Sequence, residues 1–349
     1  MTNNLLILSL VTPAACVLGL LFTFLARRFL LRRAVLDRPN ERSLHKEPVP
    51  RGGGLAVMAV VLPGLALALV FTGSLFPHTW LLLAAVLLVL VSWLDDRRGA
   101  AIVLRFSVHL LAAGAGSLAF GPDQLLFGGF LPLWADRVAM ILAWVWFMNL
   151  YNFMDGIDGI TGVETLCLVT GVALVFWFFK LGDPFHFTLV ALLLGTIGGF
   201  LVLNWHPAQI FLGDAGSVPL GFLTGYLLLL LAANHHQAAA LILPLYYLAD
   251  SGITLGRRVW RGEKFWQAHR QHYYQRAALV LGKHDTVVQW VLHTNLILLV
   301  AALLSALTLP TAWAWRLWPL RFFCERCIKW PHYDTPSFPP KPARDGLHA

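Results

Sequence analysis

The stretch VAMILAWVWFMNLYNFMDGIDGIT, residues 138–161, joins an apolar run to a polar end. Its first eleven residues carry no charge, which is typical of a helix buried in a membrane. Two asparagines and two aspartates then follow at three-residue intervals, at Asn149, Asn152, Asp155 and Asp158. Amides and carboxylates at the end of such a helix indicate a site at the membrane surface.

The composition of the whole chain agrees with a membrane protein. Of its 349 residues, 58% are hydrophobic and only 13% are charged, whereas a soluble domain has about a quarter charged residues. The mean hydropathy is +0.68, and apolar runs near the ~20 residues that a spanning helix needs recur along the chain. We therefore predict an all-α, polytopic membrane protein with about ten transmembrane helices. The predicted helices cover residues 5–30, 55–73, 79–94, 101–120, 137–152, 162–180, 185–203, 217–233, 238–256 and 286–309.

Basic residues concentrate in one set of connecting segments. Residues 27–51, 95–99 and 257–283 are rich in Arg and Lys, whereas the alternate connections are nearly uncharged. The positive-inside rule places the basic set in the cytoplasm, so the surplus charge of +8 reflects these loops and not a nucleic-acid partner. The unusual polar residues fall in the same set, which predicts a site on the cytoplasmic face of the bilayer. Residues 1–309 are predicted to form one membrane domain, followed by a C-terminal tail, 310–349, that is partly interfacial or disordered.

Aspartates in these segments are candidates for binding a metal ion or a phosphate group. Asp95 and Asp96 end a helix, where the helix dipole disfavours negative charge, so a cation should lie nearby, either Arg97 and Arg98 or a metal ion. Asp155 and Asp158 share a face if their stretch is helical. Asp214, in FLGDAGS, precedes a helix and suits a metal–phosphate group. Solvated acids at helix ends and a simple helix cap are the alternatives.

Histidines and arginines accompany these acids. His269 and His272 lie three residues apart, beside Arg270 and Arg276. We interpret them as phosphate contacts rather than as a zinc site, which would need three or four ligands. A basic surface segment resting on anionic lipid is the alternative.

The remaining polar features extend this inventory. Arg51 and Lys46 lie beside the glycine run 52–54, which opens a helix and suits phosphate. Several carboxylates without a cysteine cluster favour a hard ion, Mg²⁺ or Mn²⁺. At a membrane surface, these groups indicate phosphoryl transfer between a soluble nucleotide and a lipid. A membrane transporter with a one-sided acidic ion site is the alternative, although we expect no matching polar set on the opposite face.

Four motifs carry a resemblance to a known family. DDRRG at 95–99, NLYNFMDGIDG at 149–159, FLGDAGS at 211–217 and HRQHYYQR at 269–276 resemble the polyprenyl-phosphate N-acetylhexosamine-1-phosphate transferases. This superfamily includes phospho-MurNAc-pentapeptide translocase and the enzymes that start O-antigen and enterobacterial common antigen synthesis. The resemblance covers about residues 1–309, in order.

The resemblance implies a reaction and its participants. Undecaprenyl phosphate attacks the β-phosphorus of a UDP-N-acetyl-sugar, UMP leaves, and a lipid-linked diphospho-sugar remains. Mg²⁺ is the implied cofactor, with Mn²⁺ as a substitute. The implied location is the bacterial inner membrane, with an active site on the cytoplasmic side. The implied branch is the one that starts O-antigen or other surface polysaccharides.

The resemblance also implies roles for residues of this chain. Asp95 and Asp96 match the acidic pair that deprotonates the lipid phosphate and organises the metal–diphosphate site. Asp214 matches a metal-binding acid, and we expect Asp96 and Asp158 to share that metal. The residues expected to be catalytic are Asp95, Asp96, Asp158, His269 and His272.

Substrate-binding residues follow from the same match. Phe211 corresponds to an aromatic side chain that stacks on uracil, and Asn149, Asn152 and Asp155 are expected near the nucleotide. The other expected substrate contacts are Arg51, Lys46, Arg270 and Arg276.

HRQHYYQR departs from the three consecutive histidines of the pentapeptide enzymes, which argues against their substrate. The sequence leaves open which sugar is transferred and whether two copies of the chain form a homodimer.

Overall fold

The computed structural model describes residues 2–37, 47–264 and 269–308. All of them belong to the first of the two units into which the chain divides, Met1–Thr311. Lys46 and the predicted tail 310–349 lie outside the described residues, so their expected roles and the domain boundary stay predictions.

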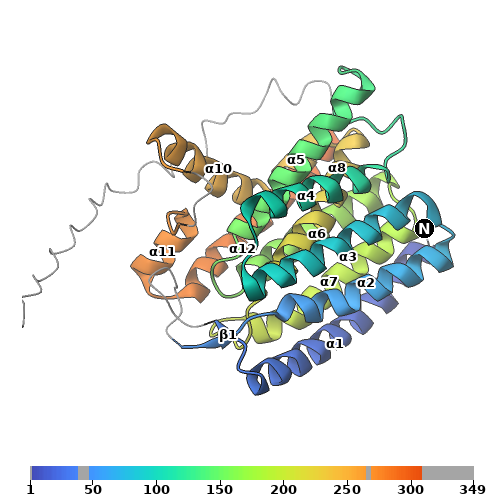
Figure 1. Cartoon of the computed structure of the whole chain (residues 1–349). Helices are drawn as coiled ribbons and strands as arrows, with labels where there is room; N and C mark the ends of the chain where they lie inside the picture. Colours follow the sequence, from blue (N-terminus) through green and yellow to red (C-terminus); the bar gives the residue numbers. More distant parts are fainter. Residues whose placement is uncertain (1, 38–46, 265–268, 309–349) are drawn as a thin grey trace, which may run out of the picture. The chain divides into compact units, whose positions relative to one another are not determined.

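The described residues form helices and one short hairpin (Figure 1). The helices are α1 (Thr2–Arg32), α2 (Gly53–Thr72), α3 (Leu75–Arg98), α4 (Ile102–Ser117), α5 (Leu133–Phe153), α6 (Ile160–Phe179), α7 (Pro184–Asn204), α8 (Asp214–Ala233), α9 (Gln237–Ile242), α10 (Leu245–Trp260), α11 (Tyr273–Leu281) and α12 (His284–Thr308). The two strands, β1 (Leu36–Asp37) and β2 (Val49–Pro50), pair antiparallel.

Within the described ranges, eight helices are long and apolar enough to cross a membrane: α1, α2, α3, α5, α6, α7, α8 and α12. The shorter α4 is also apolar, with 16 residues. Each of these nine helices overlaps a predicted segment, which confirms an all-α, multi-pass membrane protein.

The predicted helix 238–256 differs from the structure. The chain is broken there into α9 and α10, with Leu243 and Pro244 between them. Proline cannot donate the backbone hydrogen bond that a continuous helix needs. The face that α10 buries includes Asp250, Ser251 and Arg258, so this helix is amphipathic rather than apolar.

Helix α8 forms the centre of the bundle. It packs against α2, α3, α5, α6 and α9, and every residue from Ala215 to Ala233 is buried. By contrast, α1 packs on α7 and α2 and exposes large apolar side chains on its other side, as a lipid-facing helix does. The central position of α8 fixes the place of Asp214, its first residue.

Two glycines allow the start of α8 to approach α2 closely. A side chain on either Gly54 or Gly216 would collide with the backbone of the other helix. The segment before α2 is held to the segment before α8 as well, because the N–H groups of Gly52 and Gly53 both donate to the carbonyl of Phe211, at 3.1 and 2.8 Å. These contacts bring Arg51 next to the N-terminus of α8.

A network of polar side chains lies at the N-terminal end of α7, away from the end at Asn204. Asp183 caps this helix, and its Oδ1 lies 2.7 Å from Nδ1 of His186, whose Nε2 lies 2.8 Å from the Tyr226 hydroxyl. Polar residues are therefore not confined to one end of the bundle, contrary to the sequence-based expectation. The first turn of α7 explains this network, because its free N–H groups need a capping partner.

Candidate active site

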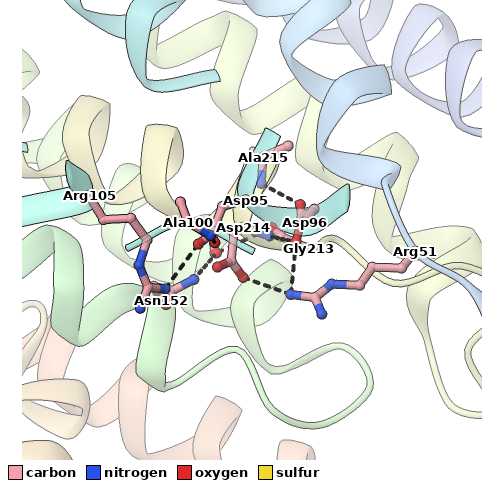
Figure 2. A network of polar contacts seen from close by, with 10 residues as sticks. Arg51, Asp95, Asp96, Ala100, Arg105, Asn152, Gly213, Asp214 and Ala215 are labelled. Carbon is pink, nitrogen blue, oxygen red and sulfur yellow. Dashed lines mark hydrogen bonds and ion pairs between the residues drawn. The ribbon is translucent and has the colours of Figure 1, made fainter. Parts of the chain in front are cut away.

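Three aspartates and two arginines meet where α3, α4 and α8 approach one another. We call Arg51, Asp95, Asp96, Arg105 and Asp214 the carboxylate cluster. One nitrogen of Arg51, Nη2, lies 2.8 Å from Oδ1 of Asp96 and 2.8 Å from Oδ1 of Asp214 (Figure 2). Burial opposes the charge of Arg51, but Asp96 and Asp214 outweigh it and raise the pKa of its guanidinium. The two carboxylate oxygens thus converge on one cationic group.

Asp96 also caps helix α8 from outside that helix. Its Oδ1 accepts the backbone N–H of Asp214 at 3.1 Å, and its Oδ2 accepts that of Ala215 at 2.9 Å (Figure 2). The positive end of the helix dipole stabilises a carboxylate in this position. Gly213 has φ +75°, and a Cβ atom there would press on the Asp96 carboxylate. Glycine at 213 is therefore needed for both the turn and the cap.

Asp95 faces a different partner. Its Oδ2 lies 2.9 Å from Nη1 of Arg105 in α4, and its Oδ1 accepts the N–H of Ala100 at 2.6 Å. Cations do lie beside the acidic pair, but they are Arg51 and Arg105 rather than the adjacent Arg97 and Arg98. The two neighbouring acids are thereby held in separate positions.

The end of α5 contributes polar groups beside this cluster. The Nδ2 of Asn152 donates to Oγ of Ser217, in the first turn of α8, at 2.8 Å. Asp155 accepts a hydrogen bond from the Thr161 hydroxyl at 2.7 Å. Burial raises the pKa of Asp155 to about 7; the Thr161 bond opposes this rise, and the charge of Asp214 adds to it. Asp155 therefore lies within electrostatic range of the carboxylate cluster.

Asp158 belongs to a second group, which we call the histidine cluster: Asp158, His206 and His284. Oδ2 of Asp158 lies 2.6 Å from Nδ1 of His206 and accepts the Ala208 N–H at 3.1 Å, while Oδ1 lies 3.3 Å from Nδ1 of His284. Burial alone would raise the pKa of Asp158, but the two histidines outweigh it and lower the pKa below its usual value.

The three expected metal ligands are therefore divided. Asp96 and Asp214 share Arg51, whereas Asp158 pairs with two histidines. The reason is local: α5 ends at Phe153 and α6 begins at Ile160, so Asp155 and Asp158 lie in an irregular loop and do not share a helical face.

The expected catalytic histidines lie at the start of α11. His272 is 2% exposed, and its Nδ1 lies 3.1 Å from Oδ1 of Asp250. Asp250 also accepts the N–H groups of Tyr273 and Tyr274 at 3.0 Å each, so it caps α11. His269 stacks on His272, with ring centroids 4.9 Å apart. Burial, together with the charges of His272 and Arg258, lowers the pKa of His269 to about 4.

Helix α11 reaches the loop at the end of α5 through Tyr274. The Tyr274 hydroxyl donates to the carbonyl of Phe153 at 3.0 Å. This contact links the histidine segment to the DGIDG loop, although His272 itself is directed to Asp250.

The other expected residues are placed as follows. Phe211 lies beside Arg51, with which its backbone forms a bridge. Asn149 donates to the carbonyl of Val145 within α5, at 2.7 Å. Arg270 and Arg276 are exposed to solvent.

Sequence reasoning missed Arg105, His206, His284 and Asp250. Arg105 and Asp250 lie inside predicted helices, where a single charged residue in an apolar context was the available signal. His206 and His284 gave no signal, because isolated histidines near helix ends are common in packed structures.

Comparisons with known proteins point to one family. Residues 78–232 match the sequence profile described as Glycosyl transferase family 4. The chain is 30% identical to the undecaprenyl-phosphate alpha-N-acetylglucosaminyl 1-phosphate transferase of Yersinia pestis, over 78% of this chain and 77% of that protein. It is 24% identical to the probable undecaprenyl-phosphate N-acetylglucosaminyl 1-phosphate transferase of Bacillus subtilis, over 74% and 73% of the two chains. It is 29% identical to the decaprenyl-phosphate N-acetylglucosaminephosphotransferase of Mycolicibacterium smegmatis, over 62% and 58%.

Proposed function

We infer the reaction from one premise: this chain belongs to glycosyl transferase family 4. The chain transfers a sugar 1-phosphate from a UDP-N-acetyl-sugar to a polyprenyl phosphate, which we propose to be undecaprenyl phosphate, and releases UMP. The curated relatives that match most of its length are named for transfer of this kind. The product is a lipid-linked diphospho-sugar of the type that starts surface polysaccharide synthesis.

One observation carries this proposal: Oδ1 of Asp96 and Oδ1 of Asp214 both lie 2.8 Å from the same nitrogen of Arg51, at the N-terminus of α8. Two carboxylates that converge on one point bind a cation there, and a helix N-terminus beside them favours phosphate oxygens. Phosphoryl transfer depends mainly on such positioning and charge stabilisation.

The donor set fits a magnesium ion. All converging ligands are carboxylate oxygens, which Mg²⁺ prefers, and it commonly binds through one or two of them together with substrate phosphates. The Arg51 side chain is 38% exposed and can turn outward to leave the shared position to the ion. Asp214 and Asp96 would hold the ion, which would supply positive charge to stabilise the negative charge on the departing UMP.

The protein's own residues have distinct tasks in this scheme. Arg51, freed from the carboxylates, contacts a substrate phosphate. Asp95, held by Arg105 and the Ala100 N–H, faces the acceptor phosphate and accepts its proton. The acceptor phosphate then attacks the donor directly, so no phosphorylated enzyme forms. Phe211 stacks on the uracil, and Asn152 and Asp155 lie beside the nucleotide.

The site faces the cytoplasm of a bacterial inner membrane. Support comes from the positive-inside rule, because Arg and Lys are concentrated in the sequence segments that join α1 to α2 and that follow α10. UDP-sugars are cytoplasmic metabolites, whereas the acceptor's polyprenyl chain stays between apolar helices and avoids water.

Transport across the membrane is not favoured. The opposite-end network of Asp183, His186 and Tyr226 is accounted for as a helix cap. Between the two ends, α8 is surrounded by packed side chains along its whole length.

Purified chain in detergent, with undecaprenyl phosphate and Mg²⁺, tests the reaction against UDP-linked GlcNAc, GalNAc, FucNAc and QuiNAc. We expect UMP release with at least one donor, dependent on both the lipid and the divalent ion. A reaction without the lipid acceptor marks simple hydrolysis. Absence of UMP release with every donor, from protein that remains folded, would contradict the proposal.

A further inference from the structure

The histidine cluster brings together three ligands from segments far apart in the chain. Asp158 comes from the loop after α5, His206 from the loop after α7, and His284 is the first residue of α12. One ligand atom from each residue can be chosen so that all three lie within 4.8 Å of one another. Ligands around one metal ion are separated by a few ångströms, so this spacing suits a shared ion.

A hydrogen-bonded pair of Asp158 and His206 does not account for the third residue. His284 is only 8% exposed, and its Nδ1 is buried yet makes no hydrogen bond of good geometry, although it faces Oδ1 of Asp158 at 3.3 Å. A buried polar atom left without a hydrogen bond costs free energy. An ion placed between the imidazole and the carboxylate would satisfy both.

We propose that Asp158, His206 and His284 bind a divalent transition-metal ion of the zinc class. Two imidazole nitrogens and one carboxylate oxygen are a set that Zn²⁺ uses when a fourth position is left to water. Mg²⁺ prefers an all-oxygen set, so this site and the carboxylate cluster select different ions. The His206 side chain is 35% exposed, which provides a path for the ion to enter.

Neighbouring groups hold two of the ligands in place. The N–H of Ala208 donates to the Asp158 carboxylate at 3.1 Å. Asn204 links the same two loops, because its Oδ1 accepts the Gly159 N–H at 3.0 Å and its Nδ2 donates to the Ile210 carbonyl at 2.9 Å. Bonds of this kind orient ligands and are typical of metal sites.

An ion here would tie three segments together. The loop that carries His206 continues directly into Gly213 and Asp214, and the loop that carries Asp158 also carries Asp155. The ion would therefore brace the loops next to the carboxylate cluster. The inference concerns metal binding alone and does not depend on the transfer reaction.

Cobalt is a suitable probe, because Co²⁺ replaces Zn²⁺ and absorbs visible light strongly when histidines bind it in a tetrahedral site. The full chain is stripped with a chelator and titrated with Co²⁺ in excess Mg²⁺, which fills all-oxygen sites. We expect one Co²⁺ per chain with strong visible absorption, displaced by Zn²⁺. The absorption should vanish in His206→Ala and His284→Ala. It should persist in His293→Ala, an exposed histidine on the same helix.

Two further measurements keep the test decisive. If an alanine variant does not fold, His206→Gln and His284→Gln replace it, because glutamine keeps a polar side chain but binds Co²⁺ poorly. Elemental analysis of the purified chain should find zinc-class metal in the wild type and less in the variants. Strong Co²⁺ absorption that survives in folded His206 and His284 variants, or none in folded wild type, would overturn the proposal.

Discussion

Asp155 and Asp158 lie three residues apart in one loop, yet they belong to different chemical environments. Asp155 is within range of the carboxylate cluster, where three aspartates outnumber two arginines. Asp158 is a single acid between two imidazoles. The first group has surplus negative charge that invites a hard cation, whereas the second offers nitrogen ligands. The comparison shows that spacing within one motif does not decide which site each residue joins.

The largest expected effect comes from Asp214→Ala. It removes one of the two carboxylates that converge beside α8, so we expect UMP release to fall by roughly 10²- to 10³-fold or to vanish. The variant should still insert and fold, because α8 keeps its cap from Asp96. Asp123→Ala, in an exposed loop, is the matched control. Near-normal turnover in Asp214→Ala would contradict the assignment of the Mg²⁺ site to the carboxylate cluster.

Asp95→Asn separates turnover from binding. This residue is held by Arg105 and has no contact with Arg51, so its loss should leave the convergent pair intact. We expect turnover to fall roughly 100-fold, while the sugar nucleotide binds almost as in the wild type. Equilibrium binding of the UDP-sugar and initial rates of UMP release measure the two effects. An equal loss in both would assign Asp95 to nucleotide binding.

Arg51→Gln sharpens the charge argument. Without the guanidinium, Asp96 and Asp214 repel each other, so stability without divalent ions should fall by about 1 kcal/mol, since this side chain is partly exposed. Added Mg²⁺ should restore more stability to the variant than to the wild type. Thermal unfolding with and without Mg²⁺ measures this difference, and Arg32→Gln, exposed at the end of α1, is the control. If Mg²⁺ stabilises the Arg51→Gln variant and the wild type equally, the guanidinium of Arg51 and the ion do not occupy the same position.

The smallest effect concerns pH. The pKa of Asp155 is raised to about 7, so the folded chain holds this proton more tightly than the unfolded chain. Stability therefore falls as the pH rises from about 4 through about 7. Asp155→Asn removes that loss, so its melting temperature without divalent ions should exceed the wild-type value by more at about pH 8 than at about pH 5. The same difference at both pH values would show that burial does not raise the pKa of Asp155 in the folded chain.

The membrane helices could be predicted from the sequence because a long apolar run in a bilayer must satisfy its own backbone hydrogen bonds, which a helix does. The helix predicted at 217–233 is observed at Asp214–Ala233, and the helix predicted at 286–309 is observed at His284–Thr308, so only the ends differ. The segment 238–256 was the exception, since mean hydropathy there conceals Pro244 and a polar face. The short strands beside Arg51 gave no periodic signal at all.

The sequence indicated most of the residues of the candidate site but not which of them lie together. Asp96 and Asp214 were singled out as sharing one position, yet they are 118 residues apart, and their contact follows from the close approach of Gly54 and Gly216. Asp158 was expected to share their metal ion because of the family resemblance, but in the structure it pairs with His206 and His284. His206 is 48 residues from Asp158, a pairing that no local pattern could indicate.

Helix α8 has one further consequence, for how natural variants of this chain are read. Its apolar sequence resembles that of a lipid-facing segment, but every side of it contacts protein. Replacing Gly221 or Gly225 by leucine keeps the segment apolar. The new side chain would nevertheless collide with Tyr151 at position 221 or with Trp144 at position 225. A prediction based on hydrophobicity alone would class such a substitution as harmless, whereas the steric clash is expected to destabilise the folded chain.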